Sequence, residues 1–203
     1  MNRVDSFVDE RDYELLKSDR YTFFVMKRVM GEDTTLLLSD HERVIICFTG
    51  NPFPVWIWTP DDVTEEEMER TYQLAKENEM LSGEYRFNLK YTLAEYFIKR
   101  AAEEGSRFSV SMNMYAYDCP DPIEPKIKAE GRIHCCDIND LEEVVEFLEI
   151  FHNNVGIDKK DVQSYRTDAE SFIGSGNMYF WKDDQGNNVA SCRYAYNLPL
   201  KNG

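Results

Sequence analysis

The run "HCCD" at residues 134–137 brings together the residue types in this sequence that most resemble metal ligands. Imidazole and thiolate groups are the ligands that Zn²⁺ prefers in proteins. The run lies within "GRIHCCD", which has the pattern of a β-strand, and neighbouring residues of a strand point to opposite faces. His134 and Cys135 therefore cannot readily bind one ion together, and we expect no metal here. For the same reason we expect Cys135 and Cys136 to face opposite ways.

The sequence contains five cysteines, which are Cys47, Cys119, Cys135, Cys136 and Cys192. Their number is odd, and no two of them have the C-x-x-C spacing of a redox or zinc motif. The N-terminal stretch "MNRVDSFVDERDYELLK" is charged and amphipathic, and it lacks the apolar segment of a secretory signal. We therefore expect a cytoplasmic protein in which all five cysteines are free thiols.

No residues have the pattern of a Ser-His-Asp triad, a Walker phosphate loop or a zinc motif, so the sequence favours none of those enzyme classes. The stretch "FIGSG" at 172–176 has the two glycines of a phosphate-binding loop, but it ends an expected helix instead of beginning one. We interpret it as a helix C-cap. Tyr165, Trp181, Tyr194 and Tyr196 could contact a substrate, and they could equally be core aromatic residues.

The elements that would position these residues are predicted by hydrophobic periodicity, caps and turns. The first part of the chain has the pattern of a helix over 6–30, followed by a hairpin whose strands are 43–50 and 54–60. Two further helices are expected to begin at Thr64 and Thr92, and a strand is expected over 107–117. Both later helices begin with a capping box, because a Glu follows each Thr by three residues. The helix from Thr92 has an apolar stripe and ends at Gly105; the stripe is Leu93, Phe97, Ile98 and Ala101.

The stretch "DCPDPIEPKIKAEG", with Pro120, Pro122 and Pro125, is the clearest candidate for a linker. After it we expect a strand, two helices and a hairpin: "GRIHCCD", a helix over 140–152 with Asn139 as its N-cap, a helix over 158–173, and the strands "MYFWKD" and "NVASCRYAY". The inward faces of the two helices are expected to hold Leu141, Val144, Val145, Leu148 and Phe151, and Val162, Tyr165, Ala169, Phe172 and Ile173.

The composition is that of a soluble globular protein, with 203 residues of which 42% are hydrophobic. Nowhere do 18 apolar residues follow one another, so we expect no membrane-spanning helix. The net charge of −15 argues against a nucleic-acid partner, since a phosphate backbone is bound by clustered Lys and Arg. An acidic surface is compatible with a cationic acceptor such as an amine, and it also simply keeps a protein soluble.

Three stretches resemble the GNAT acyltransferase family, whose fold opens with a strand, two helices and a hairpin. "AEGRIHCCDINDLEEVVEFLEIFHNNVGID" looks like the start of the C-terminal domain of two-domain GNAT proteins, where a Gly-led strand runs into an acidic-capped helix. "NMYFWKDDQGNNVASCRY" is similar to the family's second and third strands. "VIICFTGNPFPVWIWTP" would be the central hairpin of a degenerate N-terminal half.

The resemblance implies a mixed α/β (α+β) chain with two GNAT-like halves, of which the second is incomplete. The first half would cover residues 1–125 and the second 126–203, with the division near 120–130. The implied function is that of an N-acetyltransferase, or an N-terminal fragment of one, that transfers an acetyl group from the cosubstrate acetyl-CoA to an amine on a small molecule or a peptide.

In the family, the hairpin is followed by a fourth strand and a helix, and their junction carries the motif Q/R-x-x-G-x-G/A. Backbone N–H groups of that loop hold the pyrophosphate of acetyl-CoA. The sequence stops at Gly203 without this motif, and "FIGSG" has Ser171 where Gln or Arg would stand. We therefore expect the 203-residue chain to bind acetyl-CoA weakly and not to turn over, and no catalytic or cofactor-binding residue can be assigned by resemblance.

The resemblance implies that this sequence contains part of the segment that lines the acceptor site in the family. The segment between the first two helices lines the acceptor site in the family, and it corresponds here to His152, Asn153, Asn154 and Asp158, with Tyr165 on the next helix. For His152, the alternative interpretation is a helix-end residue that the helix dipole favours.

A second hypothesis is a non-catalytic GNAT-like protein that binds a partner. The last strand would expose one edge, where another copy of the chain could pair. An unrelated α/β binding protein is the third hypothesis.

Overall fold

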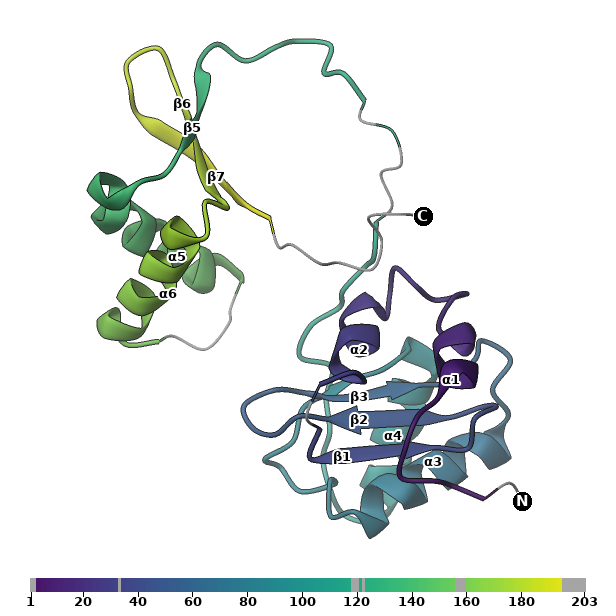
Figure 1. Ribbon diagram of the computed structural model, residues 1–203. Coiled ribbons are helices and arrows are strands. Elements are labelled where there is room, and N and C mark those ends of the chain that lie inside the picture. Colours follow the sequence, from purple (N-terminus) through teal and green to yellow (C-terminus); the bar gives the residue numbers. More distant parts are fainter. Residues whose placement is uncertain (1–2, 33, 118–120, 122, 156–159, 195–203) are drawn as a thin grey trace. The chain divides into compact units, whose positions relative to one another are not determined.

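The computed structural model describes residues 3–32, 34–117, 121, 123–155 and 160–194 (Figure 1). The chain has two compact units, which we call the N-terminal unit, within Met1–Pro120, and the C-terminal unit, within Asp121–Asn197. The division falls in the proline-rich stretch. Each unit combines helices with one sheet, which confirms the expected mixed α/β class. No helix in the described ranges has the length and apolar character needed to cross a membrane.

The N-terminal unit is built on a four-stranded sheet of order β1-β2-β3-β4. Its strands are β1 (Leu36–Ser39), β2 (Ile45–Phe48), β3 (Val55–Trp58) and β4 (Phe87–Asn88). The first three are antiparallel, and β4 runs parallel to β3. The predicted hairpin is confirmed as β2 and β3, whereas β1 and β4 were not predicted.

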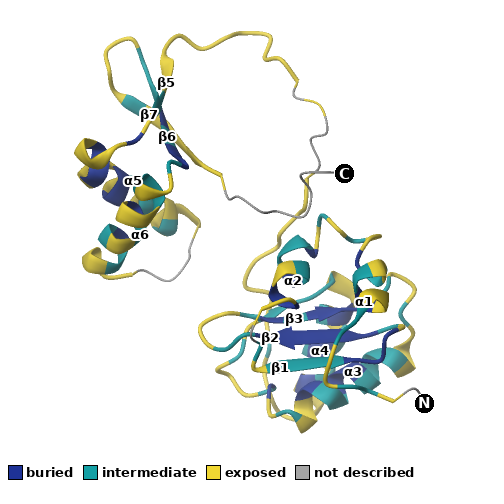
Figure 2. Ribbon diagram, viewed as in Figure 1, coloured by how far each residue is buried: buried dark blue, intermediate teal, exposed yellow. Residues whose placement is uncertain are grey.

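Helices cover both faces of this sheet (Figure 1). The helices α1 (Glu10–Leu15) and α2 (Phe24–Val29) pack on one face, and α3 (Glu65–Glu77) and α4 (Tyr91–Glu103) pack on the other. The alternation of strand residues separates the two cores. In β2, Ile45 and Cys47 contact the first pair of helices, and Ile46 and Phe48 contact the second pair. Both faces of β2 are therefore apolar, and all four of its residues are buried (Figure 2).

The predicted helix over 6–30 is wrong, because the structure has two short helices there. Ser18 and Asp19 favour a turn between them. The Asp19 carboxylate accepts a hydrogen bond from Trp58 Nε1 at 2.7 Å and pairs with Lys90 Nζ at 2.6 Å. These contacts tie the turn to β3 and to the residue that precedes α4, and the sequence pattern alone does not reveal them.

The cap of α3 is confirmed and that of α4 is wrong. Thr64 and Glu67 form the expected reciprocal capping box. In contrast, α4 begins at Tyr91, and its N-cap Lys90 makes no side-chain cap. The helix starts early because Leu93, which is fully buried, packs in the core from its first turn. Phe97 and Ala101 of the expected stripe are also buried, Ile98 is half-buried, and Gly105 follows the C-cap with φ of 82°.

The predicted strand over 107–117 is also wrong. Its residues belong to no strand, and all except the half-buried Phe108 are exposed (Figure 2).

The C-terminal unit has a three-stranded antiparallel sheet of order β5-β6-β7. Its strands are β5 (Arg132–Cys135), β6 (Met178–Lys182) and β7 (Asn188–Arg193). Two helices, α5 (Leu141–Val155) and α6 (Val162–Gly174), pack with the sheet around a core that includes Val144, Tyr165 and Phe180. The predicted strand, two helices and hairpin are confirmed, and residues 195–203 lie outside the described part.

Two details of this unit differ from expectation. The residue that begins the helical region is Asp137, not Asn139, and its carboxylate caps a short 3-10 turn, η1 (Ile138–Asp140), before α5. Phe151 and Val162, expected to point inward, are 53% and 65% exposed. The interpretation of "FIGSG" as a C-cap is confirmed, because Ser175 is the C-cap of α6 and Gly176 follows with φ of 68°.

Candidate functional site

The residues expected on the acceptor side lie at the end of α5 and in α6. The ring of His152, in the last turn of α5, meets the ring of Tyr165 edge-on, with centroids 5.1 Å apart. Tyr165 is buried, and its hydroxyl accepts a hydrogen bond from the backbone N–H of Lys160 at 3.2 Å. Asn153 and Asn154 are exposed at the end of the helix, and Asp158 lies outside the described residues. The structure thus brings together His152 and Tyr165 only.

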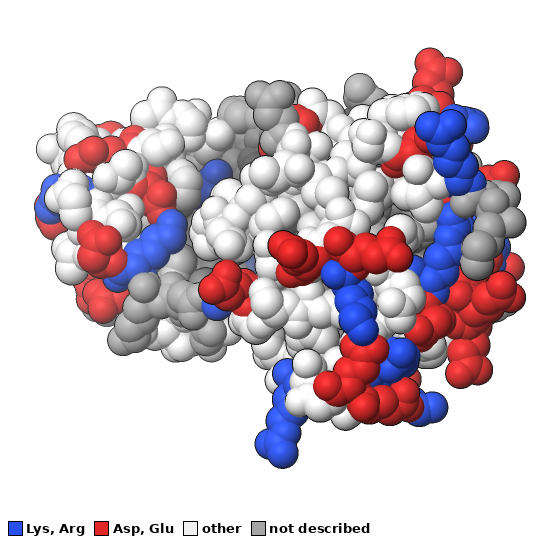
Figure 3. Space-filling view, turned by 90° about the horizontal axis from the view of Figure 1, so that it is seen from below, with Lys and Arg blue, Asp and Glu red and all other residues white. Residues whose placement is uncertain are grey.

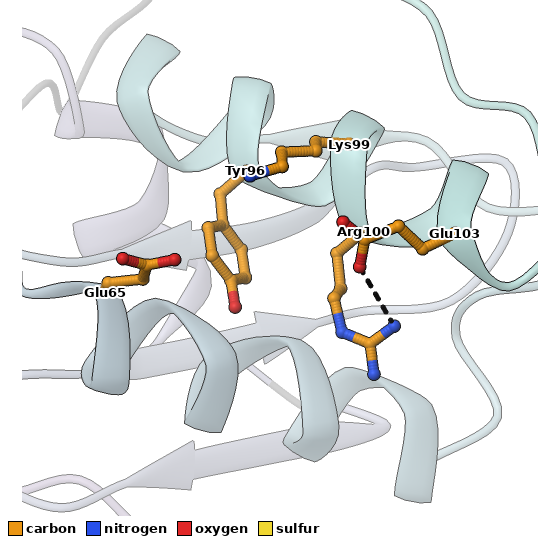
Figure 4. Close-up of a pocket in the computed structure, with 5 residues that line it drawn as sticks. All are labelled: Glu65, Tyr96, Lys99, Arg100 and Glu103. Atoms are coloured by element: carbon orange, nitrogen blue, oxygen red, sulfur yellow. Dashed lines mark ion pairs between the residues drawn. The ribbon is translucent and has the colours of Figure 1, made fainter.

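A charged pocket of about 160 Å³ lies between α3 and α4 (Figure 4). It is lined by Glu65 of α3 and by four residues of α4: Tyr96, Lys99, Arg100 and Glu103. Arg100 Nη1 pairs with Glu103 at 3.7 Å, as the dashed line in Figure 4 shows.

The pocket's polar groups are bound to one another through Glu69 of α3. Its carboxylate accepts hydrogen bonds from the Tyr96 hydroxyl at 2.6 Å and from Arg100 Nε at 3.0 Å. The hydrogen bond from Tyr96, followed by that from Gln73, lowers the pKa of Glu69. Burial and the hydrogen bond to Glu69 raise the pKa of Tyr96 to about 12, so its hydroxyl stays protonated at neutral pH and cannot serve as a base. This network joins α3 to α4 and engages both Tyr96 and Arg100.

The network was missed in the sequence, although its spacing gives a signal. Tyr96 and Arg100 lie four residues apart, as do Glu69 and Gln73, so each pair shares one face of its helix. What the sequence does not give is the pairing of α3 with α4.

A second cluster is buried where the N-terminal segment meets β1. Asp12 accepts a hydrogen bond from Ser39 Oγ at 2.5 Å and another from the backbone N–H of Asp9 at 2.8 Å, and it lies 2.7 Å from His41 Nδ1. Asp12 is fully buried and His41 nearly so. Among the described residues, His41 Nε2 has no hydrogen-bond partner, and it lies 3.6 Å from Asp5 Oδ2.

Asp9, Asp12 and His41 are close enough together to be considered as metal ligands, since their ligand atoms lie within 4.8 Å of one another. The two carboxylates are already engaged, however. Both Asp12 oxygens accept hydrogen bonds, and the Asp9 carboxylate is held by the Arg11 guanidinium at 2.7 Å. The hydrogen bond from Arg11 lowers the pKa of Asp9 to about 2. The cluster therefore fits a hydrogen-bonded clamp that fastens α1 to the strand β1.

The "HCCD" run has no shared ligand geometry. His134 Nε2 lies 2.7 Å from Asp140 Oδ2, whereas Cys135 is exposed and Cys136 is buried. The expectation that the two cysteines face opposite ways is confirmed. Burial raises the pKa of the Cys136 thiol to about 11 and that of Cys47 to about 12. Both, like Cys135 and Cys192, are free thiols, and Cys119 lies outside the described residues.

The connection between β3 and α3 is strongly acidic. The stretch "TPDDVT" at 59–64 contains Asp61 and Asp62, and Glu residues fill the first turn of α3. Arg43 pairs with Asp62 at 2.9 Å and with Glu67 at 2.7 Å, and hydrogen bonding from Arg43 lowers the pKa of Glu67 to about 2. Lys and Arg likewise lie among Asp and Glu on the face in Figure 3. This helix N-terminus is thus occupied by carboxylates and disfavours an added anion.

No protein-family model, curated protein or solved structure matches this chain.

Proposed function

We propose that the chain is a GNAT-like N-acetyltransferase, or part of one, that transfers an acetyl group from acetyl-CoA to an amine. The observation that carries the proposal is the order of elements in the N-terminal unit. A strand-like bridge between Asp5 and Ser39 precedes α1 and α2, and three antiparallel strands and a helix follow. The GNAT family has the same order: a strand, two helices, antiparallel strands and a helix.

The C-terminal unit supports two GNAT-like halves. Its order, β5, α5, α6, β6 and β7, repeats the strand, two helices and hairpin with which the family's fold opens. A chain with this opening twice is expected of a two-domain member.

Within this proposal the N-terminal unit is the non-catalytic half. The family's pyrophosphate loop joins the fourth strand to the following helix, which corresponds here to the connection between β3 and α3. That connection has no glycine, and its two Asp residues and the acidic first turn of α3 would repel a pyrophosphate. The same observation favours the second candidate function, a GNAT-like protein that binds a partner without catalysis.

The amine acceptor would bind to the C-terminal unit, near His152 and Tyr165. An imidazole at the end of α5, beside a buried tyrosine, suits a site that accepts a proton from an amine. The net charge of −15 favours a cationic acceptor over an anionic one.

Isothermal titration with acetyl-CoA tests the assignment of the N-terminal unit. We expect the 203-residue chain to bind acetyl-CoA with a dissociation constant on the order of millimolar. This corresponds to a binding free energy of about 4 kcal/mol in magnitude. Binding in the low micromolar range would show that the acidic connection does not exclude the coenzyme. In that case the N-terminal unit alone, residues 1–120, should be titrated to locate the site.

Turnover is tested on the full-length protein, by release of free coenzyme A with a panel of amines. We expect turnover, with a kcat/KM for the amine that falls at least about tenfold in His152→Ala. Glu149→Ala, which changes an exposed residue of α5 outside the candidate acceptor site, is the matched control. Absence of both acetyl-CoA binding and turnover would favour the partner-binding function.

A further inference from the structure

The segment 107–117 has the residue pattern of a strand without a strand partner. Its apolar residues alternate with small polar ones: Phe108, Val110, Met112, Met114 and Ala116 against Ser109, Ser111 and Asn113. This period of two places the apolar side chains on one face of an extended chain. Within the described residues, however, no strand pairs with the segment.

The apolar side chains of this segment are largely open to solvent. Val110 is 45% exposed, Met112 47% and Met114 65%. Contiguous apolar surface of this kind marks an interaction site in a soluble protein, and unpaired backbone N–H and C=O groups provide a template for another strand.

One end of the segment is fixed to the core of the N-terminal unit. Phe108 packs edge-on against Phe87 of β4, with ring centroids 6.1 Å apart. Because Phe108 belongs to the same face as Val110 and Met112, the apolar stripe continues outward from the core between the sheet, α3 and α4. The segment is thus fixed to the N-terminal unit at Phe108, and its remaining residues are exposed to solvent.

The charge and the symmetry of the sequence of segment 107–117 indicate which partner could pair with it. Arg107 is the only charged residue between 107 and 117, in a chain of net charge −15, so two copies can approach here without the repulsion that opposes contact elsewhere. The alternation is also self-complementary. If two antiparallel copies are centred on Met112, Val110 lies opposite Met114 and Phe108 opposite Ala116, so each residue of the stripe Phe108, Val110, Met112, Met114 and Ala116 faces another residue of that stripe.

We propose that segment 107–117 is a docking strand for a second copy of this chain, paired antiparallel about a two-fold axis at Met112. The pair would be isologous, so that each copy contributes the same surface. This interaction is independent of acetyl transfer and uses none of the residues assigned to it.

Sedimentation velocity over a range of concentrations tests the pairing. We expect a monomer–dimer equilibrium in the unaltered chain. Met112→Asp would place two like charges opposite each other at the axis and raise the dissociation constant of the dimer at least about tenfold. The control Tyr91→Asp changes a residue that is 61% exposed on α4, and it should leave the dimer unchanged. A monomer at every concentration, or a dimer that Met112→Asp does not weaken, would overturn the proposal.

Disulfide formation tests the orientation, in a chain whose Cys119, Cys135 and Cys192 are replaced by Ser. Met112→Cys should oxidise to a covalent dimer, because residue 112 lies opposite itself at the axis. Val110→Cys should not cross-link with itself, but it should cross-link when mixed with Met114→Cys. Self-linking of Val110→Cys as efficient as that of Met112→Cys would indicate a parallel pair and contradict the antiparallel arrangement.

Discussion

Asp12 shows how much a single buried carboxylate contributes to the N-terminal unit. It is fully buried and contacts Ser39, His41 and the backbone of Asp9. In Asp12→Asn the amide has only one acceptor oxygen, so at least one of these groups loses its partner. We expect the free energy of unfolding to fall by about 2–4 kcal/mol, measured by urea denaturation. The control Glu14→Gln, which removes an exposed ion pair with Lys17, should change it by less than about 1 kcal/mol.

At Gly131 an added side chain would clash with the backbone of the C-terminal unit. The φ of Gly131 is 122°, and an added Cβ would lie 2.3 Å from the carbonyl oxygen of Lys182 and 2.7 Å from Trp181 Nε1. Gly131→Ala should therefore destabilise the unit by about 1–3 kcal/mol and shift the fluorescence of Trp181. Gly83→Ala is the matched control, because a Cβ at Gly83 would meet nothing within 4 Å. Equal stability of the two variants would contradict the close approach at Gly131.

At the scale of elements, the start of α3 gives a dependence on pH. The Glu67 carboxylate, paired with Arg43, has a folded pKa of about 2 against an ordinary value of 4.5. A lowered folded pKa means that the pair stabilises the fold above about pH 4.5 and that this contribution is lost as the pH falls toward 2. Because the pair is partly open to solvent, its contribution is about 1 kcal/mol.

The comparison of Glu67→Gln with the unaltered chain isolates this contribution. Unfolding free energies from urea denaturation should differ at neutral pH and converge near pH 2. The neighbouring Glu66→Gln, at an exposed position, should differ from the unaltered chain by less than about 0.5 kcal/mol at neutral pH. If the difference in unfolding free energy between Glu67→Gln and the unaltered chain stayed constant down to pH 2, the carboxylate would contribute by packing and not by its charge.

Caps and turns in the sequence predicted the nearby helices and strands correctly. The predictions that failed concern elements that depend on contacts between residues far apart in the sequence. The capping box at Thr64 and the turn at Asn51 lie within a few residues of the structure they specify, and α3 and the β2–β3 hairpin were predicted correctly. In contrast, the break in 6–30 depends on contacts of Asp19 with residues 39 and 71 positions away. The two-residue strand β4 has too little pattern of its own, since it is defined by its pairing with β3.

The candidate sites follow the same division. The apolar stripe of the helix expected over 158–173 predicted that Tyr165 would point inward, but it did not predict the hydrogen bond that the Tyr165 hydroxyl accepts from Lys160. The Asp12 and His41 cluster joins residues 29 positions apart, and the loop that holds His41 gives no periodic signal. Such clusters are properties of the packed chain, whereas caps and stripes are properties of short sequence stretches.

At the scale of the whole molecule, each unit has its own core. The two cores of the N-terminal unit are made only of residues from its own range, and so is the core of the C-terminal unit. Each unit buries one free cysteine of raised pKa in a core: Cys47 in one core of the N-terminal unit and Cys136 in the core of the C-terminal unit. Buried thiols react only when their surroundings open, so these two report separately on the opening of each unit.

The last prediction is that the units open independently. Ile45→Val, in the core of the N-terminal unit that contains Cys47, should lower the free energy of opening there by about 1 kcal/mol and speed the modification of Cys47 several-fold. Val144→Ala should speed the modification of Cys136 instead, because Val144 packs in the core of the C-terminal unit. The measurement is thiol labelling of the native chain followed by mass spectrometry of each cysteine, with exposed Cys135 and Cys192 as fast internal references. If either substitution accelerated both buried thiols equally, the chain would open as one cooperative structure, and the division into two units would not extend to stability.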